Sequence, residues 1–289
     1  MKNFDPRVTA ARPDLAAVEL KGKVAAARFS AGRVMRISRG VAALRGAPDD
    51  AAGLSTELLF GERFTVYEQK DGWAWGQAAL DGYVGYVRAD ALALPGEDST
   101  HRVTSLSTPL LSALDAKRAA HAARDARARL PMNAKLCVTQ TDGVFVHLDD
   151  GGYVLAEHLS ALSQPETDWV AVAERFTGVP YLWGGKTAAG LDCSGLIQTA
   201  LEAGGRAAPR DTDMMEAALG RSVPVTADLS GLRRGDLVFW KGHVGVMRDS
   251  QTLLHANAFV MKVASEKLAD AHARIAKSEG AIRAIKRLG

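Results

Sequence analysis

One β-rich segment occurs twice in the chain, and this internal repeat constrains the fold more than any other feature of the sequence. Residues 54–94 and 130–162 both read as short apolar strands separated by turns. Asp71-Gly72 in the first copy corresponds to Asp142-Gly143 in the second. Asp-Gly pairs between alternating apolar residues are typical of tight hairpin turns. The repeat therefore predicts two copies of a small β-barrel.

Composition and charge exclude several classes of protein. The chain has 289 residues, 47% of them hydrophobic, which is ordinary for a soluble globular protein with two or three domains. Its 36 basic and 33 acidic residues leave a net charge of only +3, so we expect no nucleic-acid partner. The chain has only two cysteines, Cys137 and Cys193. One disulfide could not hold a chain of this length together, so the protein is not a disulfide scaffold.

Membrane and export signals are not found in the sequence. No apolar run of signal-peptide length follows Lys2, and no stretch of about 18 apolar residues occurs that could span a bilayer. We therefore expect a cytoplasmic protein that has no membrane partner.

Helical segments are expected around the second β copy and at the end of the chain. Residues 111–129 are Ala-rich with scattered Lys and Arg, which predicts a solvated helical insertion, with a ligand-binding patch as the alternative. Thr167 or Asp168 can cap the next helix. Residues 264–289 predict a helix followed by a last strand, with Ile282 and Ile285 as core candidates.

Cys193 follows a glycine-rich loop and precedes an apolar stretch that begins at Leu196, so it is predicted to lie at a helix N-terminus. Unpaired N–H groups and the helix dipole favour a thiolate there, and the same N–H groups can hold an oxyanion. Cys193 is thus a candidate nucleophile, with a buried structural thiol as the alternative.

Two histidines are candidates for the base that would act on this cysteine. His243 follows a strand-like segment, and His255 comes 12 residues later, a spacing that suits neighbouring antiparallel strands joined by a hairpin around Asp249-Ser250. His243 could then pair with the sulfur, and His255 could fix the orientation and tautomer of His243.

These residues together give a specific resemblance. The chain resembles the NlpC/P60 family of papain-like cysteine peptidases, preceded by two bacterial SH3-like domains. The resemblance rests on four matches in the expected order, followed by His255: Tyr181-Leu182-Trp183-Gly184-Gly185, Asp192-Cys193-Ser194-Gly195, Gly235-Asp236-Leu237-Val238-Phe239 and His243-Val244-Gly245. It implies an α+β fold. The expected segments are a lead segment 1–35, SH3-like domains 36–96 and 100–163, and a peptidase domain 164–289.

The resemblance also implies an activity and roles for residues. Family members hydrolyse stem peptides of the bacterial cell wall, typically between γ-D-glutamate and a diamino acid such as diaminopimelate. Cys193 would attack, His243 would act as the base and His255 would orient it. Tyr181 would lie on the oxyanion side of the site, with a core aromatic beside Trp183 as the alternative.

A narrower resemblance concerns members that recycle cell-wall peptides carrying a free N-terminal L-alanine. It implies that Asp192 and Ser194 help to hold the substrate ammonium, although Asp192 could equally be a helix cap. It also implies that a tyrosine and an acidic residue from the first SH3-like domain close that end of the cleft. We choose Tyr83 and Glu57 for these roles, with a barrel-surface aromatic and a solvated carboxylate as the alternatives.

Some features stay open at this stage. Arg210 and Asp211 match an Arg-Asp pair of the relatives and could contact substrate or form a local ion pair. Cys137 has no histidine or second cysteine nearby, so it is expected in a core and no metal site or cofactor is predicted. The sequence does not reveal the oligomeric state.

The leading prediction is a cytoplasmic cysteine endopeptidase acting on peptidoglycan-derived peptides. Two alternatives remain. One is an exported hydrolase that remodels the wall, and the other is a peptidoglycan-binding module whose catalysis is vestigial. The same residues could also serve acyl transfer or hydrolysis of other amides.

Overall fold

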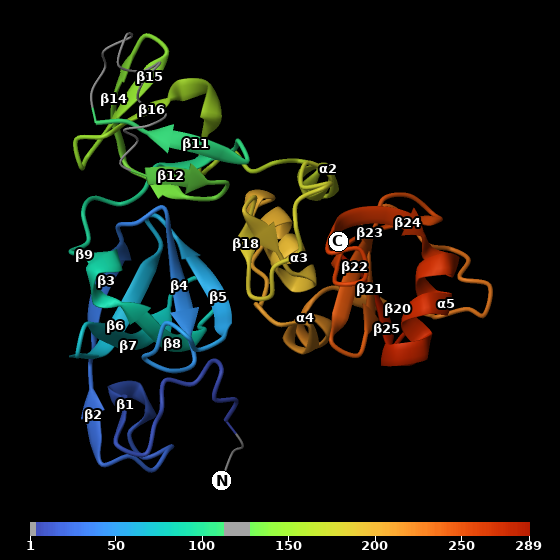
Figure 1. Ribbon diagram of the computed structural model, residues 1–289, viewed down its shortest axis with the longest axis horizontal. Coiled ribbons are helices and arrows are strands. Elements are labelled where there is room, and N and C mark those ends of the chain that lie inside the picture. The colour runs from blue at the N-terminus through green and yellow to red at the C-terminus, as the bar shows by residue number, and fades with distance from the viewer. Residues whose placement is uncertain (1–3, 113–127) are drawn as a thin grey trace. The chain divides into compact units, whose positions relative to one another are not determined.

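The computed structural model describes residues 4–112 and 128–289 and divides the chain into two compact units, residues 1–164 and 165–289 (Figure 1). We call these the first unit and the second unit. Most of the predicted helical insertion, residues 113–127, lies outside the described residues. In the described part of the chain, no helix is both long enough and apolar enough to cross a bilayer.

A seven-stranded sheet dominates the first unit, in the order β5-β4-β8-β7-β6-β3-β9. Asp71 and Gly72, with φ of 50° and 79°, form the tight turn between β6 and β7, as predicted. Leu44, Phe64 and Val87 are completely buried in its core. The sheet order is linear, so hydrogen bonds do not close these strands into the expected barrel. The strands are β3 (Arg33–Ile37), β4 (Val41–Arg45), β5 (Leu54–Leu59), β6 (Arg63–Lys70), β7 (Trp73–Ala78), β8 (Val84–Arg88) and β9 (Leu92–Ala93).

The second copy of the repeat forms three small sheets, β13-β10-β17, β11-β12 and β14-β15-β16. Its meander β14-β15-β16 corresponds to β6-β7-β8 of the first copy. Arg129 lies in strand β12, so the prediction of a helix is wrong at that end of the insertion. The strands are β10 (His101–Val103), β11 (Ser107–Leu110), β12 (Ala128–Pro131), β13 (Lys135–Leu136), β14 (Val138–Asp142), β15 (Phe145–Leu148), β16 (Tyr153–Leu155) and β17 (Leu159–Ala161).

The lead segment packs on the seven-stranded sheet. Its strands β1 (Leu15–Ala17) and β2 (Arg28–Ser30) pair in parallel, and Leu15 and Ala17 bury their side chains against Trp75 of β7. Strand β3 begins at Arg33, a little before the predicted start of the first SH3-like domain at residue 36.

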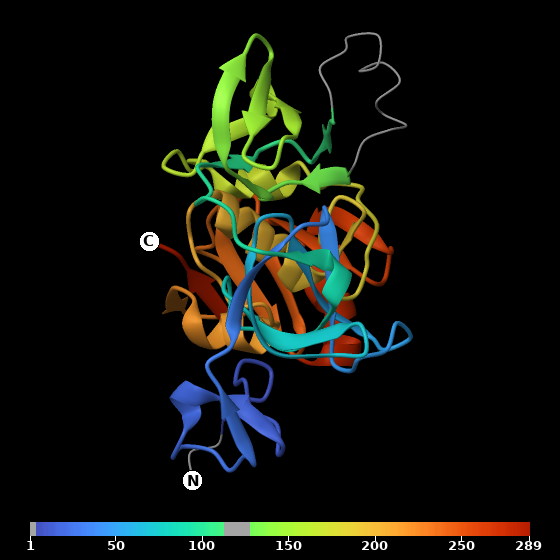
Figure 2. The same ribbon diagram turned by 90° about the vertical axis from the view of Figure 1, so that its left-hand side faces the viewer.

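Backbone contacts join the two β regions of the first unit. The amide of Lys135 donates to the carbonyl of Phe60 at 2.8 Å, and Arg36 pairs with Asp149 at 3.1 Å. In Figures 1 and 2 the seven-stranded sheet lies between the lead segment and the second β region. Within the first unit, the seven-stranded sheet therefore contacts both the lead segment and the second β region.

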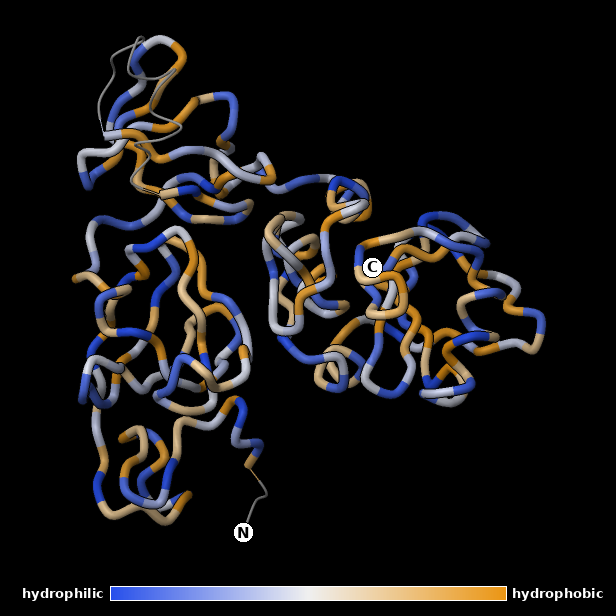
Figure 3. Tube along the Cα trace, viewed as in Figure 1, coloured by the Kyte–Doolittle hydropathy of each residue, from blue (hydrophilic) through white to orange (hydrophobic). Residues whose placement is uncertain are grey.

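The second unit is α+β, as predicted. Its antiparallel sheet has the order β20-β25-β21-β22-β23-β24, with α3 packed on β22 and β23, and apolar residues gather along the strands (Figure 3). The strands are β18 (Lys186–Thr187), β19 (Gly190–Leu191), β20 (Arg221–Val223), β21 (Asp236–Trp240), β22 (His243–Met247), β23 (Thr252–Asn257), β24 (Lys262–Lys267) and β25 (Ala284–Arg287). The helices are α2 (Trp169–Glu174), α3 (Cys193–Ala203), α4 (Thr212–Ala218) and α5 (Leu268–Glu279).

Two predictions about the ends of this unit are confirmed. The carboxylate of Asp168, rather than Thr167, caps α2 by accepting from the amide of Ala171 at 3.0 Å. The last strand, β25, follows helix α5 and buries Ile285 in the core.

Candidate active site

Cys193 is the first residue of α3, as predicted. Asp192 caps the helix, because its Oδ1 accepts from the amide of Gly195 at 2.6 Å. The thiol lies 3.8 Å from Oγ1 of Thr212, at the start of α4, and 3.9 Å from the carbonyl oxygen of Gly242. Only 7% of Cys193 is exposed. The sulfur therefore lies in a narrow space between two helix starts and the turn that leads into β22.

His243 and His255 lie on adjacent strands, β22 and β23, which pair through Val246↔Leu254. Asp249 holds the connecting hairpin by accepting from the amides of Gln251 and Thr252, both at 2.8 Å. Nε2 of His243 is 2.8 Å from Nδ1 of His255, and His255 is fully buried. The structure thus brings the two histidines together as the sequence predicted.

The sulfur lies beside the residue that precedes His243, at the start of β22. Gly242, whose carbonyl lies against Sγ, directly precedes His243 in the chain. Within the described residues, the hydrogen-bond partners of Sγ are Oγ1 of Thr212, the carbonyl of Gly242 and the backbone of Val244, and neither histidine ring is among them. The predicted pairing of Cys193 with His243 therefore stays a prediction.

Burial controls the protonation of these three groups. It raises the pKa of Cys193 to about 11, with a further increase from the nearby charge of Asp192. It also lowers the pKa of His243 to about 4 and that of His255 to about 3. The helix N-terminus at Cys193 was expected to favour a thiolate, but loss of hydration outweighs it. At neutral pH the resting site holds a thiol and two neutral imidazoles.

Tyr181 lies on the loop that leads to Cys193. It bridges to Leu191, its amide donates to the carbonyl of Met261 at 3.0 Å, and its side chain is half-buried. Burial and the neighbouring Cys193 raise the pKa of its phenol, so it is a hydrogen-bond donor at neutral pH. Trp183 is 71% exposed, so the alternative of a core pair with Tyr181 is wrong.

Asp192 and Ser194 belong to a buried ion-pair network. Arg210 is 1% exposed and donates to both carboxylate oxygens of Asp192, at 3.0 and 2.7 Å. It also donates to Oγ of Ser194 at 2.8 Å, and Gly184 donates its amide to Asp192 at 2.8 Å. The helix-cap alternative for Asp192 is therefore realised, and Arg210 forms its ion pair with Asp192.

Tyr83 and Glu57 belong to the first unit. Tyr83 is 8% exposed and lies in the core cluster of the seven-stranded sheet. Glu57 is 9% exposed in the edge strand β5. The alternatives of a surface aromatic and a solvated carboxylate are thus wrong for these residues. Their predicted roles at the cleft stay predictions.

Three residues at the site were missed by sequence reasoning, namely Thr212, Asn257 and Glu266. Nδ2 of Asn257 and Oε1 of Glu266 lie 2.9 and 2.8 Å from Nε2 of His255. Asn257 follows His255 by two residues on the same strand, so the alternation of side chains along a strand could have found it. Glu266 depends on the register of β23 and β24, which no motif specifies.

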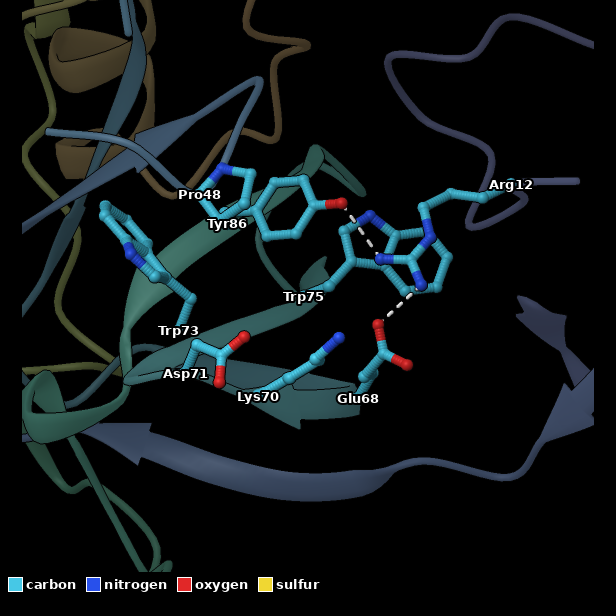
Figure 4. Close-up of a pocket in the computed structure, with 8 residues that line it drawn as sticks. All are labelled: Arg12, Pro48, Glu68, Lys70, Asp71, Trp73, Trp75 and Tyr86. Atoms are coloured by element: carbon cyan, nitrogen blue, oxygen red, sulfur yellow. Dashed lines mark hydrogen bonds and ion pairs between the residues drawn. The ribbon is translucent and has the colours of Figure 1, made fainter. Parts of the chain in front are cut away.

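A pocket of about 300 Å³ lies in the first unit, and Figure 4 shows the side chains that line it. Arg12 lies 4.4 Å from the ring centre of Trp75 and donates to Glu68 at 2.6 Å and to the Tyr86 hydroxyl at 2.9 Å. Side chains of the chain itself thus cover an aromatic face of this pocket. Its lining residues are Arg12, Pro48, Glu68, Lys70, Asp71, Trp73, Trp75 and Tyr86. None of these is a histidine or a cysteine, so the surroundings of Cys193 are the better candidate for chemistry.

Metal-binding groups are not gathered anywhere in the described part of the chain, where no three His, Cys, Asp or Glu residues form a possible metal site. Cys137 is buried as expected, and burial raises the pKa of its thiol.

Comparison with protein families identifies two segments. The model described as "NlpC/P60 family" matches residues 178–275. The model described as "Bacterial dipeptidyl-peptidase Sh3 domain" matches residues 44–92, within the first β copy.

Curated relatives and a solved structure agree with these matches. The chain is 36% identical over 97 residues to a gamma-D-glutamyl-L-lysine dipeptidyl-peptidase of Bacillus subtilis, a match that spans 31% of each protein. It is 25% identical over 236 residues to dipeptidyl-peptidase 6 of Lysinibacillus sphaericus, covering 73% of this chain and 82% of the relative. An NlpC/P60 family protein from Bacillus cereus has a similar fold, with a TM-score of 0.72 at 18% identity over 88% of this chain and 99% of that one. The second unit therefore carries a domain of the NlpC/P60 family of peptidases, and the first unit carries a bacterial SH3 domain.

Proposed function

We propose that this protein is a cysteine endopeptidase that hydrolyses the bond between γ-D-glutamate and diaminopimelate in peptidoglycan-derived peptides. The observation that carries the proposal is that the N-terminus of α3 meets the start of strand β22. Cys193 therefore lies beside Gly242, the residue before His243, and His243 is hydrogen-bonded to His255. The Bacillus subtilis relative is named for a γ-D-glutamyl-L-lysine bond, and because lysine is a diamino acid this supports the same class of substrate.

The mechanism follows from the protonation of the resting site. Sγ of Cys193 attacks the γ-carbonyl carbon while its proton passes to His243. The N–H groups at the start of α3 and the phenol of Tyr181 are the donors available for the oxyanion that forms. His243 then gives its proton to the leaving amine, and the C–N bond breaks to leave a thioester. Water, deprotonated by His243, hydrolyses the thioester and restores the thiol.

A free N-terminal L-alanine is the second part of the proposal. Two relatives are named as dipeptidyl-peptidases, and release of L-Ala-γ-D-Glu from a peptide is an instance of that reaction. Asp192 and Ser194 are the proposed acceptors for the ammonium group. They can receive it only by sharing oxygens to which Arg210 already donates. A blocked amine therefore tests this part separately from the chemistry.

Recycling of peptides inside the cell is the setting that we propose for this specificity. Released cell-wall peptides carry a free L-alanine amine, whereas in intact peptidoglycan that nitrogen is acylated. Activity on intact sacculi would instead favour an exported hydrolase, and binding to sacculi without cleavage of any peptide would favour the wall-binding alternative.

The test is a mass-spectrometric cleavage assay on L-Ala-γ-D-Glu-diaminopimelate, with the N-acetylated peptide and the Cys193→Ala variant as controls. We expect the wild-type protein to release L-Ala-γ-D-Glu, the variant to release none, and the acetylated peptide to stay nearly intact. Equal cleavage of both peptides would overturn the free-amine requirement. Cleavage of neither by the wild-type protein would overturn the proposed substrate.

A further inference from the structure

A carboxylate lies directly behind the histidine pair. Oε1 of Glu266 is 2.8 Å from Nε2 of His255, and Nδ1 of His255 is 2.8 Å from Nε2 of His243. The three side chains therefore form a continuous row of hydrogen bonds. Glu266 reaches His255 diagonally across the β23–β24 pair, because the residue directly opposite His255 is Ala264, whose small side chain leaves room.

The carboxylate fixes where the protons lie. An ionised carboxylate only accepts hydrogen bonds, so Nε2 of His255 must carry the hydrogen that it shares with Glu266. A neutral imidazole has a single N–H, which leaves Nδ1 of His255 as an acceptor. It accepts from Nε2–H of His243, and Nδ1 of His243 is then the nitrogen without a proton.

Asn257 offers the opposite arrangement. Its Oδ1 accepts from the amide of Val260 at 3.0 Å, which orients the side-chain amide and turns Nδ2 toward Nε2 of His255 at 2.9 Å. An amide N–H can only donate, so a bond from Asn257 would require a bare Nε2 on His255. Every proton in the row would then move to the other nitrogen, and His243 would have Nδ1–H and could not accept the thiol proton there.

Arg274 decides between these arrangements. This residue of α5 forms an ion pair with the same oxygen of Glu266 that faces His255. The guanidinium holds the carboxylate in place, and a hydrogen bond to a carboxylate in an ion pair is stronger than one to a neutral amide. The groups that face the histidine row thus include one carboxylate, one guanidinium and one amide, from β24, α5 and β23.

We propose that Glu266 is a positioning residue that sets the tautomers of His255 and His243, so that His243 has an unprotonated Nδ1 with which to accept the thiol proton. This inference rests on the proposed function. When His243 becomes an imidazolium, the charge of Glu266 also stabilises it through His255. The role is that of a carboxylate behind a catalytic histidine, transmitted through one additional ring.

The first test needs no substrate. We would record ¹⁵N NMR spectra of the full-length protein labelled at histidine, at neutral pH, and assign His243 and His255 with single His→Gln variants. We expect the protonated nitrogen to be Nε2 in both rings. A protonated Nδ1 on His243 would overturn the proposal and favour Asn257. Because the wild-type protein is measured, this outcome does not depend on the folding of a variant or on the substrate.

The second test compares Glu266→Gln with Glu279→Gln, which makes the same change of charge at the exposed end of α5. We expect Glu266→Gln to lower kcat by about 10- to 100-fold, as loss of an outer partner of a functional histidine does, while KM stays unchanged. Loss of the anion should also move the acid limb of kcat to lower pH. Equal kcat values and pH profiles for the two variants would overturn the proposal. A wild-type protein that cleaves no peptide would overturn the proposed function, while the NMR result would still decide the role of Glu266.

Discussion

At Cys193 and His243, burial acts against the charged forms of both side chains. The thiol is buried beside the carboxylate of Asp192, and Arg274 adds a positive charge near the histidines. Both effects leave the Cys193 thiol and the His243 imidazole uncharged before substrate binds. Catalysis then depends on proton transfer during the attack rather than on a preformed thiolate, and this difference has a measurable consequence.

We predict that the acid limb of kcat/KM lies near pH 4. His243 must be unprotonated to accept the thiol proton, and its pKa is lowered to about 4. Activity should therefore persist as the pH falls through 6.5, the usual pKa of histidine, and decline only near pH 4. The check is a profile of kcat/KM from pH 3.5 to 8, with samples returned to neutral pH to exclude irreversible unfolding. A limb centred at pH 6.5 would contradict the buried, neutral state of this imidazole.

Arg210 supports the site through Asp192, and its loss should destabilise the second unit. Arg210→Met leaves the Asp192 carboxylate buried without its guanidinium partner, which we expect to cost about 3–5 kcal/mol. Arg175→Met removes an ion pair with Glu166 that is partly exposed, and should cost less than about 1 kcal/mol. Urea unfolding of the two variants measures both values, and similar losses would show that the Asp192–Arg210 pair stabilises no more than a surface pair does.

At the scale of elements, the sequence predicted the turns and helix starts that depend on interactions between neighbouring residues. Asp71-Gly72 gave a tight turn because both residues take positive φ, and Asp192 gave the start of α3 because its side chain caps the helix. Non-local features escaped prediction. Glu266 meets His255 only through the register of two strands, and Arg129 lies in β12 because it pairs with β11 at Pro109. Composition favoured a helix there, and long-range pairing determined the outcome.

Glycines at two turns of the first unit test this difference between local and long-range effects. Gly61 and Gly143 both have positive φ, at 82° and 57°. A Cβ at Gly61 would lie 1.9 Å from the carbonyl oxygen of Lys135, whereas a Cβ at Gly143 would meet nothing within 4 Å. We expect Gly143→Ala to cost about 1–2 kcal/mol from backbone strain alone, and Gly61→Ala to cost clearly more because the two β regions must separate. Chemical denaturation of the variants measures both, and equal costs would exclude a rigid contact at Lys135.

For the whole molecule, the distribution of ionisable groups makes the two units respond differently to acid. His243 and His255 both lie in the second unit, with pKa values lowered from 6.5 to about 4 and about 3. The first unit has His101, whose pKa is lowered by burial to a smaller degree. Acid should therefore act first on the unit that carries the chemistry.

We predict that the second unit loses stability as the pH falls from 6.5 to 4. In this range the unfolded chain binds a proton at each of the two histidines and the folded unit does not. The free energy of unfolding therefore decreases as the pH is lowered. At pH 5 the loss is about 2 kcal/mol per histidine, at 1.36 kcal/mol for each pH unit below the unfolded pKa. Hydrogen exchange measured by mass spectrometry at pH 7 and pH 5 can follow peptides of residues 1–164 and 165–289 separately. After correction for the intrinsic exchange rate, protection should fall more in the second set, and replacing both histidines with glutamine should remove most of that difference. An equal fall in the two sets, or a fall that survives the double replacement, would mean that other groups govern the response to acid.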